Sequence, residues 1–497
     1  MKSHNKNKLY VDIIPQHSEV SGSCNYCTVN FPDGRKTSFL VDCGLFQEEK
    51  YKERNYSFSF DVKNVYFALV THNHIDHIGR IPKLYKDGFD GMTYATSITS
   101  QLMPTALNNT AEILLSENKR VLKKIKKASA DPESSIPNNL SIQKDILYSK
   151  NDVETALNNT LGIEYDTRIN VAQDIYVTFI KNNHILGSTS ILVEVSCKNE
   201  DSIYILFSGD YSKENVALRK ISLPKYVKNL PITIIQESTY GNSSKELIVP
   251  CFKNNVVNSI KENETLIIPV FALGRSQEIL LTLSQMQKDK LLSEKIPIYF
   301  DGALAKIYTN FYSNNKNYLN NKMKDFIPKN LISVEQEMRI DLISNRNTKI
   351  IVTTSGMGNY GPAQIYIPAY ISDSKCTIHF TGYTPEGTLG HSLKTTPSGE
   401  LCKIAGKEFK RKAHILYTNE FSGHAKQEDL LDFLDQFNNI KSVLINHGNH
   451  DAKKIYAEKV RETINTKDVE IMDVESCIRI NAFGFVKSFP NQNTASA

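Results

Sequence analysis

Three histidines and one aspartate fall within the stretch THNHIDHIGR, which begins at Thr71. They are His72, His74, Asp76 and His77. Neutral imidazoles and carboxylates are the nitrogen and oxygen ligands that zinc prefers, and two pairs on one loop suit two adjacent ions better than one. The stretch therefore predicts a metal site, whose remaining ligands must come from other parts of the chain.

Further candidate ligands stand where apolar, strand-like runs of the sequence stop. Such runs end in TSFLVDCG, SIYILFSGD, ITIIQEST, TLIIPVFALGR, KIIVTTSGMG and KSVLINHG. Loops at the carboxyl ends of strands point side chains into a shared crevice while the sheet holds them in place. The candidates that complete the metal site are His184, Asp210 and His447. A single histidine after a strand more often has a structural role. These residues therefore support a metal site only when they are taken together.

Asp210 has a particular role in this hypothesis because a carboxylate has two oxygens. It can bridge two ions that lie about 3.5–4 Å apart, with a hydroxide held between them. A site of this composition predicts a hydrolase.

The elements that position these residues indicate an α/β architecture, in which strands alternate with helical stretches. Ile78, Ile81 and Leu84 recur at the spacing of one helical face, which predicts a helix that begins near Asp76. The two histidines before it share one side of an extended segment. A chain of 497 residues exceeds what one hydrophobic core usually serves, so we expect two domains.

Composition sets the class of protein. Hydrophobic residues make up 40% and charged residues 23%, and no apolar run approaches the roughly 20 residues of a membrane span. No secretory signal is evident, and the eight cysteines form no disulfide framework, so we expect a cytoplasmic protein without membrane contact. Cys24 and Cys27 are expected to be strand residues of which at least one is buried. A net charge of +5 permits a polyanionic substrate without requiring one.

The order of these residues resembles the metallo-β-lactamase superfamily, and the second half resembles its β-CASP branch. The motifs that carry the resemblance are VDCGLFQ, HILGS, ESTYG, IPVFALGRSQEIL, TSGM, FTGYTPEGTLG, FSGHAK and INHGN. They span nearly the whole chain. It is similar to bacterial and archaeal RNA-processing metallohydrolases and to the catalytic core of the endonuclease that cleaves pre-messenger RNA before polyadenylation.

The resemblance implies a four-layer αββα sandwich with an inserted α/β β-CASP cap domain. The hydrolase domain would comprise residues 1–225 and 415–497, and the cap residues 226–414. It also implies two Zn²⁺, with Mn²⁺ or another divalent ion as an alternative. The implied ligands are His72, His74 and His184 for one ion, Asp76, His77 and His447 for the other, and Asp210 as the bridge. Asp42 is expected to orient the ligands or the bridging water.

The resemblance further implies hydrolysis of a phosphodiester by the bridging hydroxide, with Asp76 and Asp210 as essential catalytic residues. The leaving 3′-oxygen would then need a proton. His424 in FSGHAK is the expected general acid, and Glu237 in ESTYG is expected to keep its imidazolium charged and aimed. A cap or turn histidine is the competing interpretation of His424.

A cleft beside the cap would admit a single strand but not a duplex. Loops with Arg275, Ser355, Gly356 and Thr388 are expected to contact the substrate, since glycine-rich turns expose N–H groups. Glycines at tight turns are the alternative explanation. The chain departs from the family at His391, Lys426, Asn449 and the segment NSSKE, none of which is an expected metal ligand.

The leading hypothesis is therefore an endoribonuclease that cuts single-stranded RNA. A DNA-directed nuclease of the same family and a non-nuclease hydrolase or scaffold are the alternatives. Residues 116–145 add a lysine-rich amphipathic helix and a loop, for which a solvated surface is favoured over a grip on RNA. Specificity is expected to come from the cap, a homodimer or a protein partner.

Overall fold

The chain divides into two compact units in the computed structural model. The larger unit consists of Met1–Lys213, Ile221–Ser243 and His424–Ala497, and the smaller of Glu214–Lys220 and Ser244–Gly423. The structure describes residues 8–129, 145–220, 222–244, 250–260, 264–382, 384–464, 466, 468–474 and 476–490. The domain boundaries expected near residues 225 and 414 stay a prediction.

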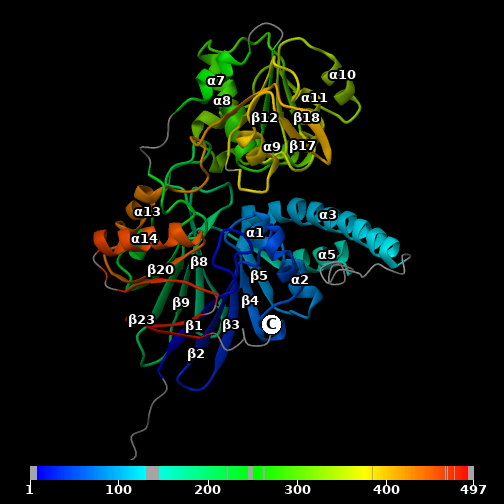
Figure 1. The fold of residues 1–497 in the computed structure, drawn as a ribbon. Coiled ribbons are helices and arrows are strands. Elements are labelled where there is room, and N and C mark those ends of the chain that lie inside the picture. The colour runs from blue at the N-terminus through cyan, green and yellow to red at the C-terminus, as the bar shows by residue number, and fades with distance from the viewer. Residues whose placement is uncertain are drawn as a thin grey trace, which may run out of the picture. The chain divides into compact units, whose positions relative to one another are not determined.

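Two β-sheets form the centre of the larger unit (Figure 1). The eight-stranded sheet has the order β23 (Gly484–Pro490), β22 (Ser476–Asn481), β1 (Tyr10–Pro15), β2 (Asn25–Asn30), β3 (Lys36–Val41), β4 (Val65–Leu69), β5 (Met92–Thr96) and β6 (Thr160–Ile163). The seven-stranded sheet has the order β21 (Val469–Ile471), β20 (Ile440–Asn446), β11 (Ile232–Glu237), β10 (Ile203–Phe207), β9 (Thr189–Val195), β8 (Ile175–Lys181) and β7 (Arg168–Ala172).

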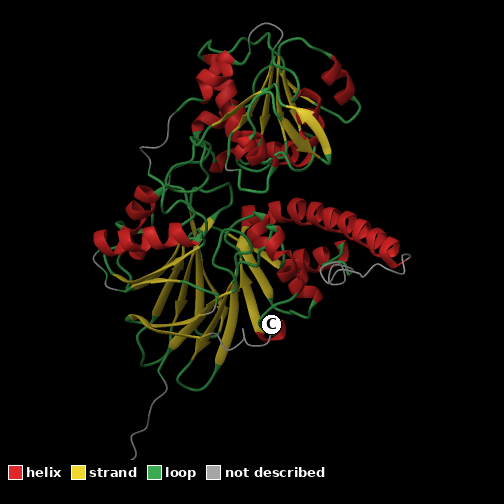
Figure 2. Cartoon of the chain, in the orientation of Figure 1, coloured by secondary structure: helices red, strands yellow, loops and turns green. Residues whose placement is uncertain are grey.

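Helices cover the outer faces of both sheets, as Figure 2 shows. Helices on the side of the eight-stranded sheet are α1 (Ile75–Ile78), α2 (Ile81–Lys86), α3 (Ser97–Ser129) and α5 (Lys150–Asn158). Those on the side of the seven-stranded sheet are α6 (Lys225–Lys228), α13 (Gln427–Leu434) and α14 (His450–Thr463). Short 3-10 helices span Glu49–Tyr56 and Val62–Asn64.

Apolar side chains alternate along the strands and fill the space between the two sheets. Phe39 and Phe67 of the first sheet stack with ring centroids 5.0 Å apart, in one buried cluster with Phe179 and Val193 of the second sheet. Two further clusters join each sheet to its own helices. The four layers are therefore helix, sheet, sheet and helix, and the predicted αββα sandwich is confirmed.

The smaller unit is built on one parallel sheet. Its strand order is β14 (Leu331–Ser333), β13 (Ile298–Asp301), β15 (Lys349–Thr353), β12 (Thr265–Pro269), β16 (Cys376–Phe380) and β19 (His414–Tyr417), and β17 (Leu401–Ile404) and β18 (Lys407–Lys410) form a hairpin. Its helices are α7 (Phe252–Asn258), α8 (Arg275–Lys288), α9 (Ala303–Asn314), α10 (Met338–Ser344), α11 (Ala363–Tyr370) and α12 (Leu389–Thr395), with 3-10 helices at Lys316–Tyr318 and Asn321–Asp325. This is the inserted α/β domain that the sequence predicts.

The lysine-rich segment belongs to the end of the long helix α3, which runs to Ser129. The loop predicted after it falls at residues 130–144, outside the described residues. Cys27 lies in β2, Cys24 directly precedes that strand, and both are buried, so the expectation that both are strand residues holds for Cys27 alone. Among the helices that the structure describes, none has the length and apolar character that crossing a membrane requires.

We predict that Phe67→Ala destabilises the larger unit by about 3–5 kcal/mol, because it removes a buried ring from the space between the sheets. The free energy of unfolding in urea measures this loss. The matched control is Tyr66→Ala on the same strand, since Tyr66 is 61% exposed and its loss should cost little. Equal losses for the two variants would contradict the assigned core.

Candidate active site

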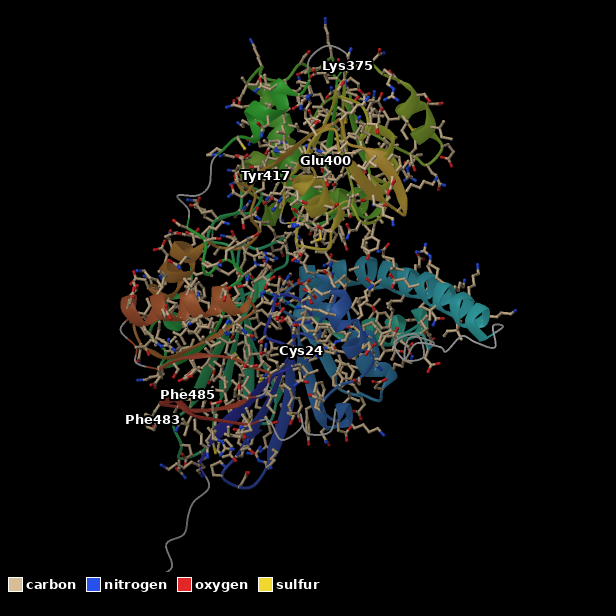
Figure 3. The ribbon with its side chains drawn as sticks, in the orientation of Figure 1. Cys24, Lys375, Glu400, Tyr417, Phe483 and Phe485 are labelled. Atoms are coloured by element: carbon tan, nitrogen blue, oxygen red, sulfur yellow. The ribbon has the colours of Figure 1, made fainter. Side chains whose placement is uncertain are left out.

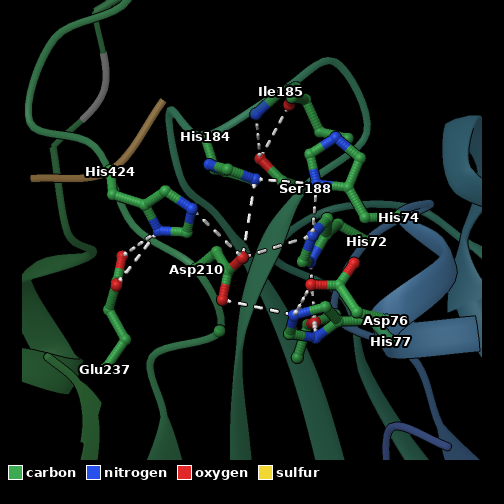
Figure 4. Close-up of polar contacts among 12 residues, drawn as sticks. His72, His74, Asp76, His77, His184, Ile185, Ser188, Asp210, Glu237 and His424 are labelled. Atoms are coloured by element: carbon green, nitrogen blue, oxygen red, sulfur yellow. Dashed lines mark hydrogen bonds and ion pairs between the residues drawn. The ribbon is translucent and has the colours of Figure 1, made fainter. Parts of the chain in front are cut away.

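Polar residues from both sheets meet at one edge of the sandwich in the larger unit (Figure 4). Asp42 follows β3. Thr71, His72 and His74 lie in the loop after β4, and Asp76 and His77 lie in the short helix α1 that follows it. From the second sheet, His184 follows β8, Asp210 follows β10, Glu237 ends β11 and His447 follows β20. His424 precedes α13. Segments distant in the sequence thus supply one site because parallel strands end at the same edge.

One group of donor atoms is formed by His72, His74, His184 and Asp210. His72 Nε2 and His184 Nε2 lie 3.0 and 3.1 Å from His74 Nδ1. Asp210 Oδ2 lies 3.6 Å from His72 Nε2 and 3.7 Å from His184 Nε2. Donors that each lie about 2.0–2.1 Å from one tetrahedral zinc are roughly 3.3–3.4 Å apart, so these spacings fit a shared ion.

A second group is formed by Asp76, His77 and His447, beside the other oxygen of Asp210. His77 Nε2 and His447 Nδ1 each lie 3.3 Å from Asp210 Oδ1, and His77 Nε2 lies 3.9 Å from Asp76 Oδ2. The two oxygens of Asp210 therefore face different groups. This is the arrangement that a carboxylate shared by two ions requires.

Several buried atoms of these groups make no hydrogen bond within the described part of the chain. They are His77 Nε2, His447 Nε2 and Asp210 Oδ1. A buried polar atom without a partner costs roughly 1–3 kcal/mol, and proteins seldom retain one without a ligand to satisfy it. The donor set thus fits metal ions in the chemistry of its atoms and in their spacing. It also fits because several of these buried atoms lack a hydrogen-bond partner.

Hydrogen bonds with Asp42 and Thr71 hold the histidine ligands in place. Asp42 Oδ1 accepts a hydrogen bond from Thr71 N at 2.8 Å, and Asp42 Oδ2 lies 2.7 Å from His77 Nδ1. The Asp42 carboxylate accepts a hydrogen bond from Nδ1–H of His77, so Nε2 is the nitrogen that faces Asp210. Burial lowers the pKa of His77, but Asp210 and Asp42 outweigh it and raise that pKa well above its ordinary value, so a metal ion at Nε2 would displace a proton. Asp42 and His447 both have a positive φ, of 61° and 48°, so the backbone is strained at two site residues.

Burial and neighbouring charges set the protonation of the ligands. Burial holds the pKa of His72 and His74 well below the ordinary value, which keeps both imidazoles neutral as metal ligands must be. Burial raises the pKa of Asp76. Burial opposes ionisation of Asp210 too, yet the surrounding histidines, His447 first, hold the pKa of Asp210 well below its usual range.

Glu237 and His424 form a pair beside the first donor group. His424 Nδ1 lies 3.1 Å from both oxygens of Glu237, and its Nε2 lies 3.8 Å from Asp210 Oδ2. The main chain also fixes Glu237, since Tyr211 N donates to its Oε1 at 2.7 Å. Burial lowers the pKa of His424, but Glu237 and Asp210 outweigh it and raise that pKa to about 9.

The residues predicted to contact substrate all lie in the smaller unit. The guanidinium of Arg275 already binds Glu278 at 3.1 Å and the carbonyl of Thr381. Ser355 Oγ accepts from the amide of Tyr360 at 3.3 Å, and Thr388 caps α12. Gly356 is buried. Their contact with a substrate stays a prediction.

Sequence reasoning missed two residues that position the site. Thr71 Oγ1 contacts Asp42, His72 and His77, at 2.9 Å from Asp42 Oδ2. Asn182 Nδ2 donates to the carbonyls of Ser208 and Asp210 and so holds the loop of the bridging carboxylate. Neither residue could be a strong candidate beforehand, because a threonine or asparagine at a strand end is ordinary.

The departures from the family pattern have structural counterparts where the structure describes them. Asn449 caps α14 by accepting from Ala452 N at 2.8 Å. Lys426 is buried, and its Nζ lies 3.7 Å above the ring of Tyr240. His391 lies in α12, and the end of NSSKE falls outside the described residues.

An αββα sandwich with histidine and carboxylate donors at its edge defines a metallohydrolase. Three family models match: the metallo-β-lactamase superfamily at residues 23–221, the β-CASP domain at 276–393 and the Zn-dependent metallo-hydrolase RNA specificity domain at 408–472. The chain belongs to the β-CASP branch of the metallo-β-lactamase superfamily of hydrolases.

Several curated relatives share this organisation. The chain is 26% identical to the transcription termination factor FttA of Methanosarcina mazei, over 92% of this chain and 70% of that protein. It is 27% identical to ribonuclease TTHA0252 of Thermus thermophilus, over 84% and 88%. It is 25% identical to endoribonuclease ysh1 of Schizosaccharomyces pombe, over 84% and 52%.

We predict that Asp42→Asn weakens metal binding by the second donor group about 10–100-fold, with the first group unaffected. An amide would present an N–H to His77 Nδ1 and favour the tautomer whose Nε2 carries the proton. Metal content after dialysis against a graded chelator measures the loss. Asp33→Asn, at an exposed turn, is the matched control, and an unchanged metal content in Asp42→Asn would contradict the role.

Proposed function

We propose that the protein is a dinuclear zinc phosphodiesterase that hydrolyses single-stranded RNA, chiefly as an endoribonuclease. The observation that carries the proposal is the sharing of Asp210. Its two oxygens face two separate donor groups, and the Glu237–His424 pair lies beside them. This combination supplies metal binding and a proton donor in one small volume, which hydrolysis of a phosphodiester requires.

The residues that would hold the ions are those of the two donor groups. His72, His74 and His184 would bind one ion, Asp76, His77 and His447 the other, and Asp210 both. When bound, the ions would lower the pKa of a coordinated water molecule to near neutrality. They would also neutralise negative charge on the phosphate oxygens. Mn²⁺ or another divalent ion is an alternative occupant of the same donors.

His424 would protonate the leaving 3′-oxygen of the ribose. Glu237 accepts a hydrogen bond from Nδ1–H of His424, so the other N–H of the imidazolium is at Nε2, the nitrogen that faces Asp210. The pKa of about 9 keeps this proton in place at neutral pH before metal binding, and nearby divalent ions lower that pKa toward the working range of an acid. Glu237 thus aims the ring and stabilises its charge.

RNA is the favoured substrate because of the comparisons. A model described as an RNA specificity domain matches residues 408–472, and relatives over most of the chain are named as ribonucleases. A DNA-directed nuclease remains the alternative, and paired substrates decide between the two. We further propose that the enzyme acts in the cytoplasm and that a homodimer or a protein partner contributes specificity.

The first test is cleavage of single-stranded RNA and DNA of matched sequence, each labelled at one end, by the zinc-loaded protein. Internal fragments from RNA alone are the expected result, since endonucleolytic cuts leave labelled products of intermediate length. Preferential cleavage of DNA would favour the alternative. No cleavage of either polymer by protein that holds two ions would overturn the proposal.

We predict that Asp76→Ala abolishes cleavage and removes one of the two ions. The variant deletes a carboxylate of the second donor group while His72, His74 and His184 stay intact. Cleavage of labelled RNA and elemental analysis of the same sample measure both effects. Full activity with two bound ions would show that Asp76 is not a ligand.

We predict that His424→Ala slows cleavage about 10²–10⁴-fold while both ions remain bound, as expected for loss of a general acid. Single-turnover rates and metal content are the two measurements. His450→Ala is the matched control, because His450 is an exposed histidine of the same unit. An unchanged rate in His424→Ala would remove this residue from the mechanism.

A further inference from the structure

Phe271 lies at an edge of the smaller unit where open parallel sheets usually bind ligands. It follows β12, the strand flanked by β15 and β16, and all three strands run parallel. Ligands of such sheets gather beyond the carboxyl ends of the strands. Phe271 is 36% exposed there, although it directly follows the fully buried Val270.

The ring of Phe271 is held rather than loosely exposed. A Cβ on Gly356 would lie 3.0 Å from the ring carbons Cδ2 and Cε2, and a Cβ on Gly382 would lie 3.1 Å from Cε2. These distances are shorter than most Cβ contacts, so the two glycines let both loops lie against the ring. The carbonyl of Phe271 also accepts from Ser276 N at 3.1 Å and Ser276 Oγ at 2.7 Å.

The immediate surroundings of the ring favour a flat, uncharged ligand group over a phosphate. The guanidinium of Arg275, at the start of the next helix, is paired with Glu278 at 3.1 Å and also binds the carbonyl of Thr381. A second aromatic residue of the same edge, Tyr360, is 62% exposed in the loop after β15. Single exposed aromatic residues are common on proteins, and Phe271 differs from them in that two glycine positions lie against its ring at an edge where ligands bind.

We propose that Phe271 is a stacking platform for a nucleobase of the bound single strand, with Tyr360 as a second aromatic contact. This inference rests on the proposed function and adds how the cap recognises a single strand. Every base has a π-face, so stacking tolerates any sequence, whereas a duplex keeps its bases inside. The platform therefore selects unpaired nucleotides without reading their identity.

The test measures binding of a phosphorothioate-linked single strand of about ten nucleotides, which resists hydrolysis, to the full-length zinc-loaded protein. Phe271→Ala should weaken binding roughly 5- to 150-fold, and Tyr360→Ala should weaken it less. Phe483→Ala is the matched control, since Phe483, labelled in Figure 3, is a 72% exposed aromatic residue of the larger unit, between β22 and β23. It should bind as the wild-type protein does.

An abasic strand of the same length separates base stacking from phosphate binding. The wild-type protein should bind it more weakly than the normal strand, and Phe271→Ala should discriminate less between the two strands, because only Tyr360 still stacks on a base. Equal binding of normal and abasic strands by the wild-type protein would overturn the platform. A merely structural role of Phe271 would weaken both strands equally.

The chain contains no tryptophan, so a single introduced one reports directly on the ring's surroundings. Tyr360→Trp should lose fluorescence when the normal strand binds and keep it with the abasic strand, while Phe483→Trp should not respond to either. This variant replaces an exposed side chain and so keeps the test valid even where Phe271→Ala folds poorly. An unresponsive Tyr360→Trp would remove the second aromatic contact.

Two failures can be told apart. If the wild-type protein binds and cleaves neither RNA nor DNA, the proposed function fails. If it binds the strand and Phe271→Ala binds equally well, only the platform fails.

Discussion

The site depends on how one buried carboxylate, Asp210, is held among histidines. Among the described residues, five histidines each place a ring nitrogen within 3.8 Å of its oxygens: His72, His77, His184, His424 and His447. Buried atoms of Asp210, His77 and His447 still have no hydrogen bond within the described residues, and such atoms cost free energy. Divalent cations would bind these atoms, and the sandwich keeps the donors from moving apart.

Holding such a cluster requires rigid support that lies outside it. Asp42 and Thr71 fix the tautomers of the histidines from one sheet, and Asn182 holds the loop of Asp210 from the other. Asp42 and His447 adopt strained left-handed backbone conformations, which the packed strands before them impose. The core between the sheets therefore contributes to chemistry indirectly, because it makes the donor positions costly to change.

Under the proposed function, the two units would divide the work between them. The larger unit contains the candidate metal donors and the Glu237–His424 pair, and the smaller unit contains Phe271 and the glycine-rich loops. In the smaller unit Arg275 is already paired with Glu278. Such a division would let recognition of a strand vary without disturbing the donors.

The sequence alone indicated the donor types and an α/β architecture, because histidines and aspartates follow apolar, strand-like runs that alternate with helical stretches. The αββα sandwich was implied only by the resemblance of the motifs to a known family. The spacing of His72, His74, Asp76 and His77 predicts a metal site from the sequence alone, because these residues are close along the chain. Tertiary structure decided which atoms face each other, such as His77 Nδ1 toward Asp42 and His424 Nδ1 toward Glu237. It also decided that the guanidinium of Arg275 binds the carbonyl of Thr381 and that Phe271 is exposed. The contacts and the burial of a side chain depend on segments that are distant in the sequence.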